Sequence, residues 1–219
     1  MTELVFYYGT MGSSKTANAL MQRFQYIERG KQVLLLKPAI DTRDDYTDKK
    51  GNKITVVKSR IGIQAKAIVI NSTQSILNLV YGQPVHPEVV ICDEAQFFTA
   101  DQIDQLKALS QNGISVFCYG LRTDFQTKLF PGSKRLFEVA DSVQELKSVC
   151  ECGRPATVNA RFKNDQLVID GEQVEIGGND LYRPMCWTCW KRATIKVSTD
   201  DKQFSTDINE LRDEWESTI

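Results

Sequence analysis

The chain lacks a long hydrophobic run, an excess of either charge, and all but one histidine. No stretch of about 18 apolar residues occurs, so no segment has the length of a membrane-spanning helix. With 27 basic and 28 acidic residues the net charge is −1, which gives no electrostatic footprint for DNA or RNA. The one histidine, His86, lies between two prolines, outside any nucleophile pattern. The N-terminus runs directly into an apolar segment without a signal peptide, so we expect a soluble cytoplasmic protein with no nucleic-acid or membrane partner.

The spacing of apolar residues predicts an α/β domain. Short apolar runs at residues 4–8, 33–36, 68–70, 88–92 and 114–119 are typical of buried strands. Helical patterns cover residues 16–29 and 73–79, and a capping box at residues 99–102 opens a third helix that ends at Gly113. This alternation favours a mostly parallel sheet over residues 1–149, with a polar loop at 39–53. Residues 150–195 form β-like runs (156–162, 167–169, 173–176) and are expected to be a separate small module, followed by a charged tail at 196–219.

A small-residue loop after the first apolar run matches a phosphate-binding P-loop. It consists of Gly9, Thr10, Met11, Gly12, Ser13, Ser14, Lys15 and Thr16. In such a loop, backbone N–H groups wrap a phosphate chain, the lysine reaches the outer phosphates and the threonine hydroxyl binds Mg²⁺. Ser14 departs from the pattern, which has glycine at that position. The alternative is an ordinary strand, turn and helix.

Two carboxylates, Asp93 and Glu94, follow the apolar run at 88–92. In a P-loop protein the first such acid holds Mg²⁺ and the next handles a proton or positions the nucleophile. A solvated turn is the alternative. The segment Asp-Glu-Ala-Gln also resembles the acidic motif of helicases, but a helicase needs two tandem domains, which 219 residues cannot supply.

Four of the six cysteines form two close pairs: Cys150 with Cys152, and Cys186 with Cys189. Two β-knuckles with these spacings would place four thiolates around one structural Zn²⁺, with no position left for water. Unpaired surface thiols are the alternative. The remaining two cysteines, Cys92 and Cys118, lie in apolar runs and are expected to be buried.

The P-loop, the segments Asp-Glu-Ala-Gln-Phe-Phe and Gly-Leu-Arg-Thr-Asp-Phe, and the cysteine pairs around Ile-Gly-Gly-Asn together resemble the small zinc-containing thymidine kinases. The similarity runs from Leu4 to about Cys189. It implies a P-loop kinase domain with a small zinc domain, assembled as a homotetramer. It also implies phosphate transfer from ATP, with Mg²⁺, to the 5′-hydroxyl of thymidine, giving dTMP for nucleotide salvage, with feedback inhibition by dTTP.

The resemblance also implies roles for individual residues. Glu94 matches the catalytic base, and Asp93 with Thr16 matches the Mg²⁺ site. Further ATP contacts beyond the loop 9–16 match Asp41, Arg43, Asp93, Glu94, Ala95 and Gln96. The thymine pocket matches Met11, Leu121 and Phe125, together with a lasso loop of Gln173, Val174, Glu175, Ile176 and Gly177, and with Tyr182.

Two other interpretations remain open. One is a different P-loop phosphotransferase or NTPase that carries a zinc knuckle, although Tyr182 and the Ile176-Gly177-Gly178 segment argue against it. The other is a zinc-ribbon nucleic-acid-binding module with a degenerate P-loop, which the charge of −1 disfavours. Consumption of ATP that depends on added thymidine would separate all three interpretations.

Overall fold

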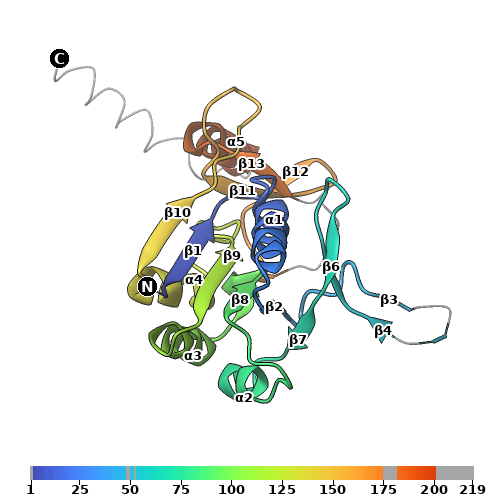
Figure 1. The fold of residues 1–219 in the computed structure, drawn as a ribbon. Helices are drawn as coiled ribbons and strands as arrows, with labels where there is room; N and C mark the ends of the chain where they lie inside the picture. Colours follow the sequence, from blue (N-terminus) through green and yellow to red (C-terminus); the bar gives the residue numbers. More distant parts are fainter. Residues whose placement is uncertain (1, 48–49, 52, 175–181, 201–219) are drawn as a thin grey trace.

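A computed structural model describes residues 2–47, 50–51, 53–174 and 182–200. Its centre is a six-stranded sheet with the strand order β10-β1-β9-β8-β2-β7 (Figure 1). Every neighbouring pair in this sheet is parallel, which confirms the predicted class. The strands are β1 (Leu4–Tyr8), β2 (Val33–Pro38), β7 (Ile68–Ile70), β8 (Val89–Cys92), β9 (Ser115–Gly120) and β10 (Ser142–Glu145).

Helices cover both faces of this sheet, as a parallel sheet requires. On one face lies α1 (Lys15–Glu28), whose Ala19 and Leu20 pack with strand residues such as Ile91. On the other face lie α2 (Ile76–Tyr81), α3 (Ala100–Gln111) and α4 (Pro131–Val139), with a short 3₁₀ turn, η1 (Ala95–Phe97). Because the central strands β8 and β9 are buried on both sides, the sheet gives a rigid base to the loops at its carboxyl edge.

Helix α3 shows how the sequence pattern specifies local structure. The Thr99 hydroxyl accepts from the backbone N–H of Gln102, whose side chain in turn accepts from the Thr99 N–H, so the predicted capping box is confirmed. Its apolar residues Ile103, Leu106 and Leu109 are fully buried, as their helical spacing predicts.

The expectation of a polar loop at residues 39–53 was partly wrong. Within and after that stretch lie two small hairpins: β3 (Tyr46–Thr47) with β4 (Lys53–Ile54), and β5 (Val56–Lys58) with β6 (Gln64–Lys66). The physical reason is an ion pair, because the fully buried Nζ of Lys37 lies 2.8 Å from Oδ1 of Asp45 and also donates to the Val56 carbonyl at 3.0 Å. This contact ties the start of the β3–β4 hairpin to the end of β2.

The second part of the chain is a three-stranded antiparallel sheet beside a helix, at the top of Figure 1. It contains β11 (Val158–Lys163), β12 (Gln166–Val168), β13 (Tyr182–Met185) and α5 (Trp187–Asp200), around a core that includes Val158, Ala160 and Trp190. The strands at 156–162 and 167–169 are thus confirmed within two residues. Of the expected strand at 173–176, Gln173 and Val174 are not in a strand, and the rest lies outside the described residues. Helix α5 was not anticipated, and it continues past residue 195.

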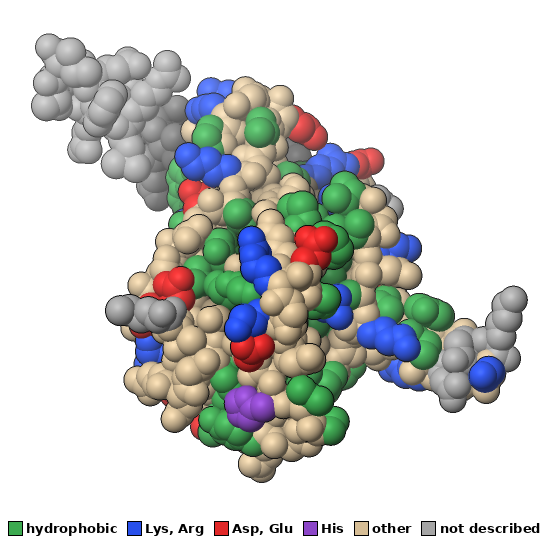
Figure 2. Space-filling model, viewed as in Figure 1, with side chains coloured by type: hydrophobic (Ala, Val, Ile, Leu, Met, Phe, Trp, Pro, Cys, Tyr) green, Lys and Arg blue, Asp and Glu red, His purple; other side chains and the backbone are tan. Residues whose placement is uncertain are grey.

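Figure 2 shows the molecule in the view of Figure 1, and on this face hydrophobic side chains reach the surface between charged ones. On α1 itself, Met21, Phe24 and Ile27 are 47%, 59% and 41% exposed at helical spacing. Among the described residues, no helix combines the length and the apolar character needed to cross a membrane.

Candidate active site

The P-loop connects β1 to α1 at the carboxyl edge of the sheet. Gly9 has no room for a side chain, since a Cβ there would lie 2.3 Å from the carbonyl oxygen of Leu146. Ser14, which occupies the usual glycine position, takes the left-handed conformation with φ 60°, and Gly12 has φ 80°. The loop therefore keeps the backbone path that the motif requires, with Ser14 carrying some strain.

Lys15 lies buried inside this loop. Its Nζ donates to the carbonyl oxygens of Thr10 at 2.8 Å and Gly9 at 3.2 Å. Burial lowers the pKa of Lys15 to about 8. The ammonium group is thus placed at the centre of the loop, and its contact with outer phosphates stays a prediction.

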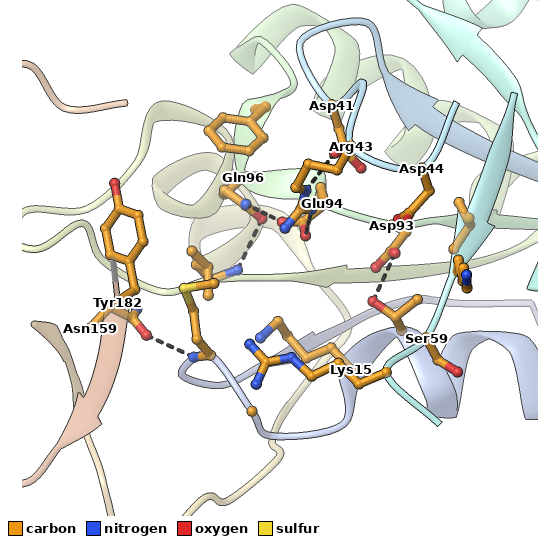
Figure 3. Close-up of a pocket in the computed structure, with 18 of the residues that line it drawn as sticks. Lys15, Asp41, Arg43, Asp44, Ser59, Asp93, Glu94, Gln96, Asn159 and Tyr182 are labelled. Carbon is orange, nitrogen blue, oxygen red and sulfur yellow. Dashed lines mark hydrogen bonds and ion pairs between the residues drawn. The ribbon is translucent and has the colours of Figure 1, made fainter. Parts of the chain in front are cut away.

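Asp93 follows β8 and lies beside the start of α1. The Thr16 hydroxyl donates to Asp93 Oδ2 at 3.0 Å, so the two residues predicted to bind Mg²⁺ meet (Figure 3). Burial, followed by the neighbouring charge of Glu94, raises the pKa of Asp93 to about 7. A hydroxyl and a carboxylate are oxygen ligands of the kind that Mg²⁺ prefers, so this pair fits the ion.

Glu94 occupies a left-handed backbone position with φ 51°, which turns its side chain toward Arg43. Arg43 donates to Glu94 Oε1 and, at 2.7 Å, to Asp41, while Gln96 donates to Glu94 Oε2 at 2.6 Å. Burial acts to raise the pKa of Glu94, but the positive charges of Arg43 and Lys15 outweigh it and hold that pKa below its ordinary value. Two adjacent carboxyl groups therefore have their pKa values pushed in opposite directions, which is the pattern of divided catalytic roles.

One cavity of about 880 Å³ brings most of the predicted site residues together. Its lining includes Met11, Gly12, Ser14, Lys15, Thr16, Asp41, Arg43, Asp93, Glu94, Gln96, Leu121, Phe125, Gln173, Val174 and Tyr182. Gly9, Thr10, Ser13 and Ala95 do not line it and belong to the supporting backbone. The predicted residues Glu175, Ile176 and Gly177 lie outside the described residues.

The cavity also has lining residues that the sequence did not reveal. The turn at 59–62 between β5 and β6 reaches it, as do Phe97, Phe130, Thr123, Asp124 and Asn159. The turn has one local signal, Gly62 with φ 90°, but the strands that flank it are too short to show alternation. Asn159 had no local signal, because its place depends on the pairing of β11 with distant strands.

The four predicted cysteines form one cluster. Their Sγ atoms all lie within 4.8 Å of one another, with Cys152 and Cys186 at 3.6 Å. A tetrahedral site with Zn–S bonds of about 2.3 Å needs sulfur atoms about 3.8 Å apart, so the cluster can hold a metal ion. The expectation of two β-knuckles was wrong for the second pair, because Cys189 lies in the first turn of α5.

A hydrogen bond from Arg154 lowers the pKa of the Cys152 thiol to about 6, whereas the neighbouring thiols Cys152 and Cys186 raise the pKa of the Cys189 thiol to about 12.

The fold and the cavity together define a P-loop nucleotide-binding protein with an apolar subsite beside two carboxyl groups. A family model described as thymidine kinase matches residues 2–190, and the chain belongs to this family. The resemblance found in the sequence is thereby confirmed.

Curated relatives support the same family. The chain is 42% identical over 215 residues to a thymidine kinase of Legionella pneumophila (strain Lens), covering 95% of this chain and 99% of that one. It is 41% identical over 218 residues to a thymidine kinase of Rhodopirellula baltica, covering 97% and 98% of the two chains. Among solved structures, the Pif1 helicase from Candida albicans aligns over 67% of this chain and 36% of its own, with 12% identity and a TM-score of 0.35, too distant to bear on function.

Proposed function

We propose that this chain transfers the γ-phosphate of ATP to the 5′-hydroxyl of thymidine and releases dTMP, a step of nucleotide salvage that supplies precursors for DNA. One observation carries the proposal. A single cavity is lined both by the P-loop residues Lys15 and Thr16 and by the apolar side chains of Leu121 and Phe125. A phosphate donor and an apolar base can therefore occupy adjoining parts of one site.

In this proposal Glu94 is the general base that accepts the proton of the 5′-hydroxyl as it attacks phosphorus. Its lowered pKa keeps it ionised at neutral pH, and Arg43 and Gln96 fix its orientation. The loop residues and Arg43 hold the donor phosphates through N–H groups and positive charge. Asp93 and Thr16 would hold Mg²⁺, which neutralises charge on the transferring phosphate when bound.

The nucleoside subsite explains a preference for thymidine. In this proposal the apolar wall of Met11, Leu121 and Phe125 accepts the 5-methyl group. Backbone groups of the expected loop at 173–177, of which residues 175–177 lie outside the described residues, would read the base edge, as the family resemblance implies. Thymine presents an N3–H donor between two carbonyls, whereas cytosine presents an acceptor and an amino group. Because backbone groups cannot change their donor or acceptor character, a buried mismatch costs about 1–3 kcal/mol for each unpaired group.

The test is an assay of the purified chain with ATP, Mg²⁺ and a panel of nucleosides. We expect kcat/KM for thymidine to exceed that for deoxycytidine by one to several orders of magnitude. Deoxyuridine should be a real substrate with about fourfold lower efficiency, since it lacks one methyl group worth about 0.8 kcal/mol. Comparable efficiency on thymidine and deoxycytidine would contradict the proposal.

The cysteine cluster is proposed to hold one structural Zn²⁺ per chain. Four thiols at tetrahedral spacing favour this ion over the oxygen-loving Mg²⁺. The cluster joins residue 150 to residue 189, so the ion would tie down both ends of the segment that carries the nucleoside loop. We accordingly divide the chain functionally into an ATP-binding domain (1–149), a zinc and lasso domain (150–195) and a tail (196–219).

Assembly, regulation and location extend the proposal. The exposed apolar stripe on α1 (Met21, Phe24 and Ile27) suits a subunit contact within a homotetramer. We infer feedback inhibition by dTTP, since dTTP carries both a thymine and a triphosphate and would fill both parts of the cavity. A cytoplasmic location matches the supply of thymidine and ATP. Light scattering would give the subunit number, and inhibition by dTTP should be competitive with both ATP and thymidine.

A further inference from the structure

One buried side chain of β11, Asn159, bridges two parts of the cavity. Its Oδ1 accepts the backbone N–H of Met11 at 2.7 Å, and its Nδ2 donates to the Thr123 carbonyl at 3.1 Å (Figure 3). The side chain is 3% exposed and lines the cavity. At these distances both hydrogen bonds are well formed, and in a buried site each depends on the other for the orientation of the amide.

The two partners of Asn159 are backbone groups of two different loops, the P-loop and the loop after β9, although the Met11 side chain itself belongs to the proposed nucleoside wall. Met11 is part of the P-loop, so its peptide helps to set the direction of the loop N–H groups. Thr123 lies in the loop after β9, between the nucleoside-pocket residues Leu121 and Phe125. Three further hydrogen bonds join the two parts of the chain on the nucleoside side: Arg122 donates to the Thr157 carbonyl, Gln126 donates to Asp170, and Gln173 donates to Asp124. Asn159 thus extends the contact of the small sheet to the phosphate side.

We propose that Asn159 is a positioning residue that couples the P-loop to the nucleoside pocket. The inference rests on the proposed function, because it assumes that thymidine and ATP occupy these two subsites. When the nucleoside fills its pocket, its contacts with the loop at 121–125 act through the Asn159 amide on the Met11 peptide, because the amide is hydrogen-bonded to both segments. The 5′-hydroxyl and the donor phosphate are then held in the geometry for transfer, so the residue acts on turnover more than on either binding step.

The experiment compares the wild-type chain with Asn159→Leu, which keeps the shape of the side chain and removes both hydrogen bonds. Thymidine affinity is measured with and without a non-hydrolysable ATP analogue, and kcat is measured with both substrates saturating. In the wild type the analogue should tighten thymidine binding. The coupling factor is the thymidine Kd without the analogue divided by the Kd with it. In the variant this factor should fall toward one and kcat should fall about tenfold, while the affinity for each ligand alone stays within about threefold of the wild type.

A control variant is Thr157→Val, at the residue just before β11, whose backbone carbonyl still accepts from Arg122. It should leave both kcat and the coupling at wild-type values. If Asn159→Leu does not fold, Asn159→Ser replaces it in the experiment. The serine hydroxyl ends one bond short of the amide and cannot bridge Met11 and Thr123, so the same results are expected.

The outcomes separate the inference from the proposed function. Absence of thymidine phosphorylation by the wild type overturns the proposed function. With an active wild type, unchanged kcat and coupling in the variant overturn the role of Asn159. An equal loss of both single-ligand affinities overturns it too, because Asn159 would then have only a structural role. A wild type in which the analogue does not change thymidine affinity also overturns it, because there would be no coupling to transmit.

Discussion

Replacement of Glu94 by glutamine isolates the proposed base with little change of shape. The glutamine keeps one carbonyl oxygen, which can accept from Arg43 or from Gln96 but not from both. Gln96 cannot simply turn over, because its Oε1 already accepts from the Leu121 N–H at 3.0 Å. The variant therefore loses the carboxylate charge and one accepted hydrogen bond while the backbone stays in place.

The expected magnitudes differ strongly between stability and turnover. The Arg43 side chain is 38% exposed and that of Glu94 14%, so solvent screens the ion pair and about 1 kcal/mol of stability is at stake. For a chain of this size this lowers the melting temperature by about 2–4 °C. Loss of a general base lowers kcat by about 10² to 10⁴, or about 2.7–5.4 kcal/mol of activation free energy.

The assay is steady-state phosphorylation of thymidine, together with calorimetric binding of an ATP analogue and a thermal melt. Glu88→Gln is the matched control, since it makes the same chemical change at the opposite end of β8. There the carboxylate pairs with Lys31 at 2.5 Å and its side chain is 46% exposed. The control should keep wild-type kcat. Turnover of Glu94→Gln within threefold of the wild type would refute the assignment of the base.

Three further predictions concern structure more than chemistry. Cys189→Ser should lower the zinc content per chain and raise KM for thymidine more than KM for ATP. The control Cys92→Ala lies outside the cluster and should keep the wild-type zinc content. Metal analysis that finds no zinc in the wild-type protein would contradict this prediction. Gly9→Ala should abolish ATP binding, because the new Cβ would collide with the Leu146 carbonyl oxygen. Gly12→Ala has open space around its Cβ but keeps φ 80°, so it should lower the free energy of unfolding by about 1–2 kcal/mol, measured in a thermal melt. Lys37→Met leaves Asp45 paired, among the described residues, with the mostly exposed Lys53 at 3.3 Å, and should lower the melting temperature by several degrees. An unchanged melting temperature would mean that the Lys37–Asp45 pair adds no net stability.

The central sheet and the phosphate side of the site could be predicted because their signals are local. A strand buried on both faces is a continuous apolar run, and the residues that follow it lie at the carboxyl edge. Lys15, Thr16, Asp93 and Glu94 could thus be expected together from the order of the chain alone. The cysteine cluster was predictable for a similar reason, since each half of it is a close pair.

Other parts of the molecule depend on contacts between distant residues. The hairpins β3 to β6 have strands of only two or three residues, too short for a periodic pattern. Their placement rests on the buried contact between Lys37 and Asp45. Helix α4 did carry a signal, Pro131 at its first position, which alone is too common to define a helix. Asn159 could not be identified as a bridging residue without the pairing of β11.

The position of β1 in the sheet has a consequence for synthesis of the chain. This strand precedes the P-loop, yet its neighbours are β9 and β10, with Leu4 opposite Val116 and Val5 opposite Ser142. On the ribosome, the first strand must wait without either neighbour until most of the parallel-sheet region has emerged. During that interval Leu4, Val5 and Phe6, at most 1% exposed in the finished fold, are open to chaperones and to other nascent chains. The P-loop is thus synthesised before the strands that flank β1, so a nascent chain that has not reached residue 115 lacks both neighbours of the strand that leads into this loop.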